Sequence, residues 1–105
     1  MKSVFRLSLI VFSLVFVLST LSFADAAADY KAKCATCHGP DGKGDTAMGK
    51  TMKVKDLGSD EVQKQSDAEL TTIIEKGKKP MPAYEGKLTK EQIDGLVKYI
   101  RSLKK

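Results

Sequence analysis

The sequence predicts an all-α fold made of four short helices in one small domain. Apolar residues recur at helical spacing, and two capping-box patterns precede the stretches in which this spacing is clearest. No stretch shows the alternation of apolar and polar residues that is typical of a strand. A chain of 105 residues forms one domain and buries only a thin core.

The first half of the chain provides one helix, a loop and a short turn. A helix is expected over about residues 27–37, ending where Gly39-Pro40 interrupts it. An irregular glycine-rich loop is expected from Gly39 to Gly58. Ser59 is a candidate cap for a short helical turn that extends through Gln65.

Two longer helices are expected in the second half. One begins at the capping box Ser66–Glu69 and ends at Gly77, a residue type common just after a helix. The other begins at a second capping box, Thr89–Gln92, and runs to about Leu103. Each carries apolar residues at helical spacing: Leu70, Ile73 and Ile74 in the first, and Ile93, Leu96, Val97, Ile100 and Leu103 in the second.

The N-terminus has the pattern of an export signal. Lys2 and Arg6 precede a run from Leu7 to Phe23 that is apolar except for Ser and Thr, and Ala24-Asp25-Ala26 fits a signal-peptidase site. We expect cleavage after Ala26, with cleavage after Ala28 as the alternative. Residues 27–105 then form the mature domain, and the periplasm is the expected location. An uncleaved membrane anchor remains the alternative.

The mature charge is modestly positive. Two of the 18 basic residues and one of the 13 acidic residues lie before position 27, which leaves 16 and 12 and a net charge of +4. This balance is too small to indicate a nucleic-acid partner and suits a carrier with a mildly cationic face.

The most specific motif is the pentapeptide Cys34-Ala35-Thr36-Cys37-His38. Two thiols three residues apart can each add to one vinyl group of a porphyrin, and C-x-x-C-H is the attachment pattern for haem c. His38 lies on the same helical face as Cys34, so its imidazole can bind the iron. The pentapeptide contains every cysteine and the one histidine of the chain. It therefore predicts one covalently bound haem c.

Other interpretations of these residues are weaker. A dithiol redox motif would be expected within a βαβ pattern, which the sequence lacks. A structural zinc site needs further Cys or His ligands, and a disulfide between Cys34 and Cys37 would close a tiny loop and stabilise little. With both thiols bound to haem, the cofactor must stabilise the small core, so the chain should fold around it.

The second axial ligand decides between electron transfer and small-ligand chemistry, because two protein ligands leave the iron only electron transfer. Met81 is the best candidate, since prolines on both sides of it stiffen its loop and prevent helix formation. A stiff loop loses less entropy when its thioether binds iron. Met48 and Met52 are the alternatives, and both lie in the flexible glycine-rich loop.

The chain resembles the small single-haem class I c-type cytochromes of bacteria over essentially its whole mature length. Residues 34–44 are similar to the family's haem-attachment site and following loop, residues 77–84 to its methionine loop, and residues 96–103 to its C-terminal helix. The resemblance implies a cytochrome c fold wrapped around the haem. It also implies that Tyr30 and Tyr99 meet where the terminal helices cross, with Gly95 as a candidate for their close approach.

These observations predict a monomeric periplasmic electron carrier, not an enzyme, with Cys34 and Cys37 bound to haem and His38 and Met81 as axial ligands. The alternatives are a haem subunit of a larger membrane complex and, less favoured, an enzyme or gas sensor with an open coordination site. Two lysine clusters should border the haem edge and favour redox partners with an acidic docking patch: Lys76, Lys78 and Lys79, and Lys50, Lys53 and Lys55. Candidate partners of the haem propionates are Lys43, Lys50, Lys53 and Tyr84.

Overall fold

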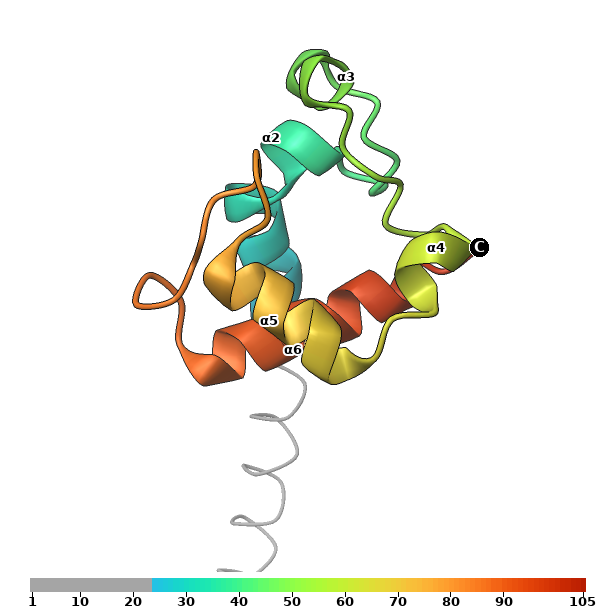
Figure 1. Cartoon of the computed structure of the whole chain (residues 1–105). Coiled ribbons are helices and arrows are strands. Elements are labelled where there is room, and N and C mark those ends of the chain that lie inside the picture. The colour runs from blue at the N-terminus through green and yellow to red at the C-terminus, as the bar shows by residue number, and fades with distance from the viewer. Residues whose placement is uncertain (1–23) are drawn as a thin grey trace, which may run out of the picture.

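The computed structural model describes residues 24–105, and within them the all-α prediction is confirmed (Figure 1). The predicted export signal lies outside the described residues except for its last three positions. Residues 24–33 are helical, and five further helices follow: α2 (Ala35–His38), α3 (Ala47–Met52), α4 (Asp60–Gln63), α5 (Asp67–Lys76) and α6 (Lys90–Ser102). None of the helices described is long and apolar enough to cross a membrane.

The helices begin where the sequence provides N-caps. Ser59, Ser66 and Thr89 each accept a hydrogen bond from the backbone N–H three residues later, at the starts of α4, α5 and α6. Thr89 and Gln92 form the predicted reciprocal capping box. The box predicted at Ser66 is one-sided, because the Glu69 carboxylate meets the Ser66 hydroxyl at 3.3 Å rather than its backbone.

The glycine-rich loop is less irregular than predicted, because it contains α3. Thr46 is its N-cap and accepts a hydrogen bond from Gly49 N. The same hydroxyl donates to the Cys37 carbonyl at 2.8 Å, so the cap also joins α3 to the end of α2. The glycines around this segment favoured a loop prediction. Residues 47–52 nevertheless include adequate helix formers, and Thr46 is a good capping residue before them.

The first predicted helix is present but is interrupted at Cys34. Residues 24–33 form its helical first part, Cys34 is a turn, and α2 continues the chain to His38. Gly39, with φ of 82°, then ends α2 as predicted. Because of this break, Cys37 N donates to the Cys34 carbonyl, and the Lys33 carbonyl can accept a hydrogen bond from another segment.

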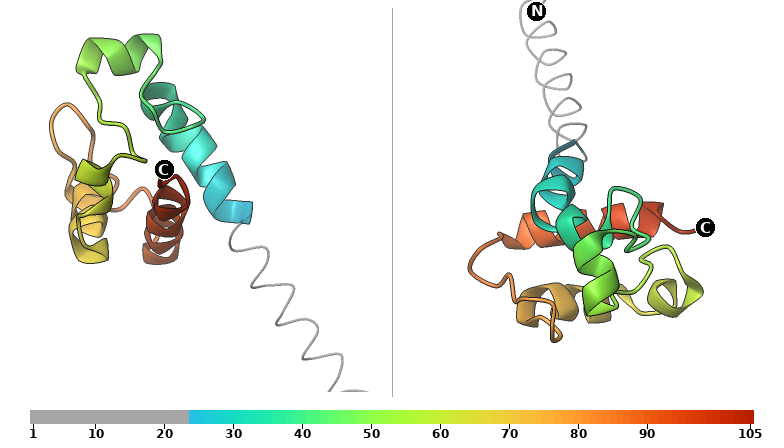
Figure 2. Two further views of the ribbon diagram at one scale, coloured as in Figure 1. Left: turned by 90° about the vertical axis from the view of Figure 1, so that its right-hand side faces the viewer. Right: turned by 90° about the horizontal axis from the view of Figure 1, so that it is seen from above.

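The core forms where the N-terminal helix crosses α6 and where α5 packs beside α6 (Figure 2). Tyr30 and Leu96 are almost completely buried there. The Tyr30 and Tyr99 rings meet with centroids 4.6 Å apart, the contact that the resemblance implied. A Cβ atom at Gly95 would lie only 3.2 Å from the Ala26 Cβ, so Gly95 provides the close approach.

Hydrogen bonds hold the C-terminal end of α6 against α4 and the chain around it. The Gln63 side-chain amide donates to the carbonyls of Leu57 and Ile100 at 2.8 and 2.9 Å. Arg101 donates to the Gln63 carbonyl at 2.8 Å. These contacts place α4 and the preceding segment on the opposite side of the molecule from the Met81 loop (Figure 1).

We predict that Gly95→Leu destabilises a haem-loaded chain that retains Ala26 by about 1–2 kcal/mol. A chain that begins at residue 27 lacks this contact. Overpacking against Ala26 costs about 1–3 kcal/mol, which exceeds the gain of up to about 1 kcal/mol from replacing a helical glycine. Unfolding in guanidinium chloride followed by circular dichroism measures the difference. Lys98→Leu, at an exposed position of the same helix, is the matched control. A Gly95→Leu protein as stable as wild type would show that the crossing of the N-terminal helix and α6 can accommodate a larger side chain at this position.

Candidate functional site

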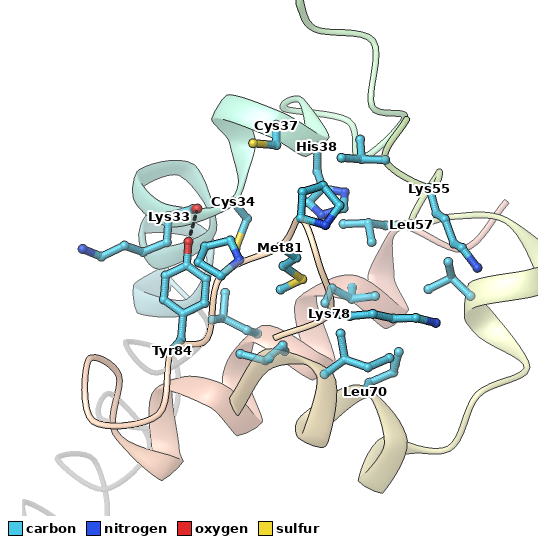
Figure 3. Close-up of a pocket in the computed structure, with 18 of the residues that line it drawn as sticks. Lys33, Cys34, Cys37, His38, Lys55, Leu57, Leu70, Lys78, Met81 and Tyr84 are labelled. Atoms are coloured by element: carbon cyan, nitrogen blue, oxygen red, sulfur yellow. Dashed lines mark hydrogen bonds between the residues drawn. The ribbon is translucent and has the colours of Figure 1, made fainter. Parts of the chain in front are cut away.

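A cavity of about 530 Å³ lies between the cysteine-bearing segment and the loop after α5. Cys34, Cys37 and His38 line it from one wall, and Met81 lines it from another (Figure 3). Its remaining lining is largely apolar, although Glu61, Gln65 and several lysines also contribute to it. The aliphatic residues that line it are Val54, Leu57, Val62, Leu70, Ile73, Ile74, Leu88, Leu96 and Ile100. A cavity of this size with apolar walls and a few polar groups is typical of a cofactor site.

Backbone carbonyls around the pentapeptide are held by hydrogen bonds from outside it. Tyr30 donates its hydroxyl to the Gly39 carbonyl at 2.7 Å in a buried position. Gly44 N donates to the His38 carbonyl at 2.7 Å, and the Thr46 hydroxyl holds the Cys37 carbonyl. These contacts fix the backbone that carries both thiols and the imidazole. The role of Thr46 was missed from sequence, although a threonine three residues before Gly49 fits an N-cap.

His38 has an imidazole suited to metal binding. Burial lowers its pKa, and the backbone of Lys55 opposes this only in part, so the ring is neutral near pH 7. Its Nδ1 atom is buried and makes no hydrogen bond of normal geometry with the described residues. A buried polar atom without a partner is uncommon in native structures and points to a missing interaction at the site.

The two cysteines are not joined by a disulfide. Burial, reinforced by the charge of Asp29 and by Cys37, raises the pKa of the Cys34 thiol to about 11. Catalytic redox cysteines have lowered pKa values, because the thiolate is the reactive form. The environment of Cys34 therefore disagrees with a dithiol redox centre.

Met81 is held by a compact loop. Lys78 N donates to the Met81 carbonyl at 3.2 Å, and Met81 N donates to the Lys78 carbonyl at 2.7 Å. Gly77, with φ of 75°, makes this turn possible, because a Cβ there would lie 2.7 Å from the Met81 carbonyl oxygen. The Met81 side chain is partly buried against the core.

The other two methionines of the mature chain are on α3. Met48 is 44% exposed and does not line the cavity, whereas Met52 is 36% exposed and lines it. Of the residues suggested as propionate partners, Lys53 and Tyr84 line the cavity. Lys43 and Lys50 do not, and Lys50 lies 3.1 Å from the Asp45 carboxylate.

The residues present fit a covalently bound haem. Two free thiols and a neutral imidazole lie on one wall, a thioether lies across an apolar cavity, and a buried nitrogen lacks a partner. Within residues 24–105 no group of three His, Cys, Asp or Glu side chains is placed to bind a metal ion.

Comparison with known proteins agrees with this chemistry. Residues 22–100 match the family model described as Cytochrome C oxidase, cbb3-type, subunit III. The chain is 35% identical over 79 residues to a cytochrome c6 of Microcystis aeruginosa, covering 72% of this chain and 90% of the relative. It is 32% identical over 105 residues to a cytochrome c6 of a Nostoc species, covering 95% and 92%.

A solved structure also matches. The KustC0563 c-type cytochrome superposes with a TM-score of 0.71 at 33% identity, over 76% of this chain and 98% of that structure. The predicted cytochrome c fold is therefore confirmed, and the pair Cys34 and Cys37 is consistent with haem attachment.

Proposed function

Because the chain belongs to the small single-domain c-type cytochromes, the cytochrome c6-like and cbb3 subunit III family, we propose that it is a periplasmic electron carrier with His38 and Met81 as axial ligands. The family itself establishes a cytochrome c6-like electron carrier with one covalent haem c, and not an enzyme. The haem, when bound, supplies one-electron exchange between Fe(II) and Fe(III).

The observation that carries the proposal is the placement of His38 and Met81 on different walls of one apolar cavity. Cys34 and Cys37 would hold the porphyrin by thioether bonds, and their backbone is fixed by the contacts of Tyr30 and Thr46. His38 is neutral and Met81 is carried by a stiff loop, so each can bind iron with little rearrangement. The apolar walls exclude water and keep the effective dielectric low.

Residues 1–26 are proposed to direct export and to be removed. If this segment were retained, the chain would instead suit the alternative of a haem subunit held in a membrane complex. The name of the matching family model, an oxidase subunit, is the observation that favours this second candidate. Identifying the N-terminal residue of the purified protein distinguishes the exported carrier from the membrane-held subunit.

We predict that the exported protein has the intact mass of residues 27–105 plus one haem.

Cys34→Ser together with Cys37→Ser should give protein without haem that is largely unfolded, because the small core depends on the cofactor. Mass spectrometry and circular dichroism measure both outcomes. A compact, helical double variant would show that the chain does not need haem to fold, and a retained residue 1 would favour the membrane-anchored alternative.

Met81→Ala should remove the weak far-red sulfur–iron(III) absorption band, lower the reduction potential and let cyanide bind readily to the oxidised protein. The reason is that the substitution deletes the thioether and leaves no other sulfur ligand on that loop. Met52→Ala is the matched control, since it makes the same change on another wall of the cavity. The assignment of Met81 fails if Met52→Ala produces these changes and Met81→Ala does not.

Redox partners with an acidic docking patch are proposed from the lysines at the cavity mouth. Of the two predicted clusters, Lys53, Lys55, Lys78 and Lys79 line the cavity. Lys50, Lys55 and Lys76 are each paired with a nearby carboxylate, Asp45, Glu61 and Glu85. Lys53, Lys78 and Lys79 make no ion pair with the described residues, so their charge is the part available to a partner.

We predict that oxidation of the reduced protein by hexacyanoferrate(III), an anionic probe, slows as salt is added, because ions screen the lysines over about 10 Å at 0.1 M. Lys78→Glu with Lys79→Glu should slow the low-salt rate roughly tenfold. Stopped-flow absorbance measures both effects. Lys87→Glu with Lys90→Glu changes the net charge equally at exposed positions outside the cavity lining. Equal effects of the two pairs would mean that total charge, and not the cavity mouth, steers the encounter.

A further inference from the structure

The loop that carries Met81 leaves and rejoins the same helix. Beyond the Lys78–Met81 turn, Tyr84 N donates to the Ile74 carbonyl and Glu85 N donates to the Glu75 carbonyl, each at 3.0 Å. An exposed ion pair between Lys76 and Glu85 also joins the end of α5 to the loop. The base of the loop is therefore attached to the end of α5, and these contacts do not reach the wall that carries His38.

Among the described residues, one side-chain hydrogen bond joins the Met81 loop to the segment that precedes the cysteines. The Tyr84 hydroxyl donates to the Lys33 carbonyl at 3.0 Å and joins residues 51 positions apart in the chain (Figure 3). Between residues 77–88 and residues 24–39 of the described chain, no other hydrogen bond is present. Tyr84 itself is well anchored, because its N–H is held by Ile74 and its carbonyl accepts from Lys87 N and Leu88 N.

The Lys33 carbonyl can accept this bond because the helix breaks at the next residue. In an unbroken helix Cys37 N would donate to Lys33, four residues earlier. Here Cys37 N donates to the Cys34 carbonyl at 3.2 Å. Cys34, with φ of −113°, is a turn residue between the two helical stretches. The interruption that presents the cysteines thus leaves a carbonyl beside Cys34, and Tyr84 binds it.

We propose that Tyr84 is a positioning residue for Met81, which holds the Met81 loop closed against the haem-attachment segment through its hydrogen bond to the Lys33 carbonyl. The inference rests on the proposed role of Met81 as the iron ligand. With the loop fixed at its base on α5 and at Tyr84 on the opposite wall, Met81 lies three residues before the second attachment and has little freedom to leave the iron. In this role Tyr84 would not bind the iron, and it would act through the position of the loop.

The test measures how readily an outside ligand displaces Met81. Imidazole is titrated into the oxidised, haem-loaded protein, and the change in the haem spectrum gives its dissociation constant. Displacing Met81 requires the loop to open and the hydrogen bond to break. Tyr84→Phe keeps the ring and removes the hydroxyl, so it should tighten imidazole binding about twofold to tenfold, the usual net worth of one hydrogen bond.

Tyr99→Phe is the matched control, because it removes the same hydroxyl from a tyrosine of α6 that does not line the cavity. It should leave the imidazole dissociation constant unchanged. A Tyr84→Phe protein with a lower unfolding midpoint but wild-type imidazole affinity would overturn the proposal, since Tyr84 would then only stabilise the fold. Equal tightening in both variants would overturn it as well.

Met81→Ala separates this inference from the proposed ligation. It should tighten imidazole binding far more than Tyr84→Phe does, because no thioether competes. If Met81→Ala leaves both the affinity and the far-red band unchanged, the ligand assignment fails and the positioning role fails with it. If Met81→Ala behaves as expected and Tyr84→Phe does not, only the positioning role is overturned.

Discussion

Tyr30 joins the hydrophobic core to the haem-attachment segment, and much of the molecule depends on this one side chain. Its ring is almost fully buried and packs on Tyr99 where the N-terminal helix crosses α6. Its hydroxyl meets the Gly39 carbonyl directly after His38. Burial raises the pKa of this phenol, which keeps it protonated and able to donate. The helix crossing therefore sets the position of the end of α2, and with it the imidazole.

The two functional walls are built in different ways. The wall with His38 is fixed by hydrogen bonds from several segments, including Tyr30, Gly44 and Thr46. The Met81 wall is a loop attached mainly to one helix, and within residues 24–105 a single hydrogen bond joins it to the segment before the cysteines. Few contacts make a segment easier to open locally. Exchange at the iron should therefore begin at the Met81 side.

Sequence alone could predict the features that depend on local chemistry. The caps at Ser59, Ser66 and Thr89 and the stop at Gly39 were found because capping and chain reversal depend on a few adjacent residues. The break at Cys34 and the helix α3 were missed, because tertiary contacts offset their weak local signals. The bond from Tyr84 to Lys33 joins residues 51 positions apart, and no local pattern encodes such a pair.

The core and the cavity wall share most of their residues, which explains why so short a chain can fold. Of the ten buried residues in the core cluster, only Ile93 and Val97 do not line the cavity. A porphyrin between these walls would add its own apolar surface to the core, at about 25 cal/mol for each Å² removed from water. Core stability and haem attachment are therefore coupled energetically. Leu70 is buried in the core and lines the cavity, so Leu70→Ala would weaken core stability and haem attachment together.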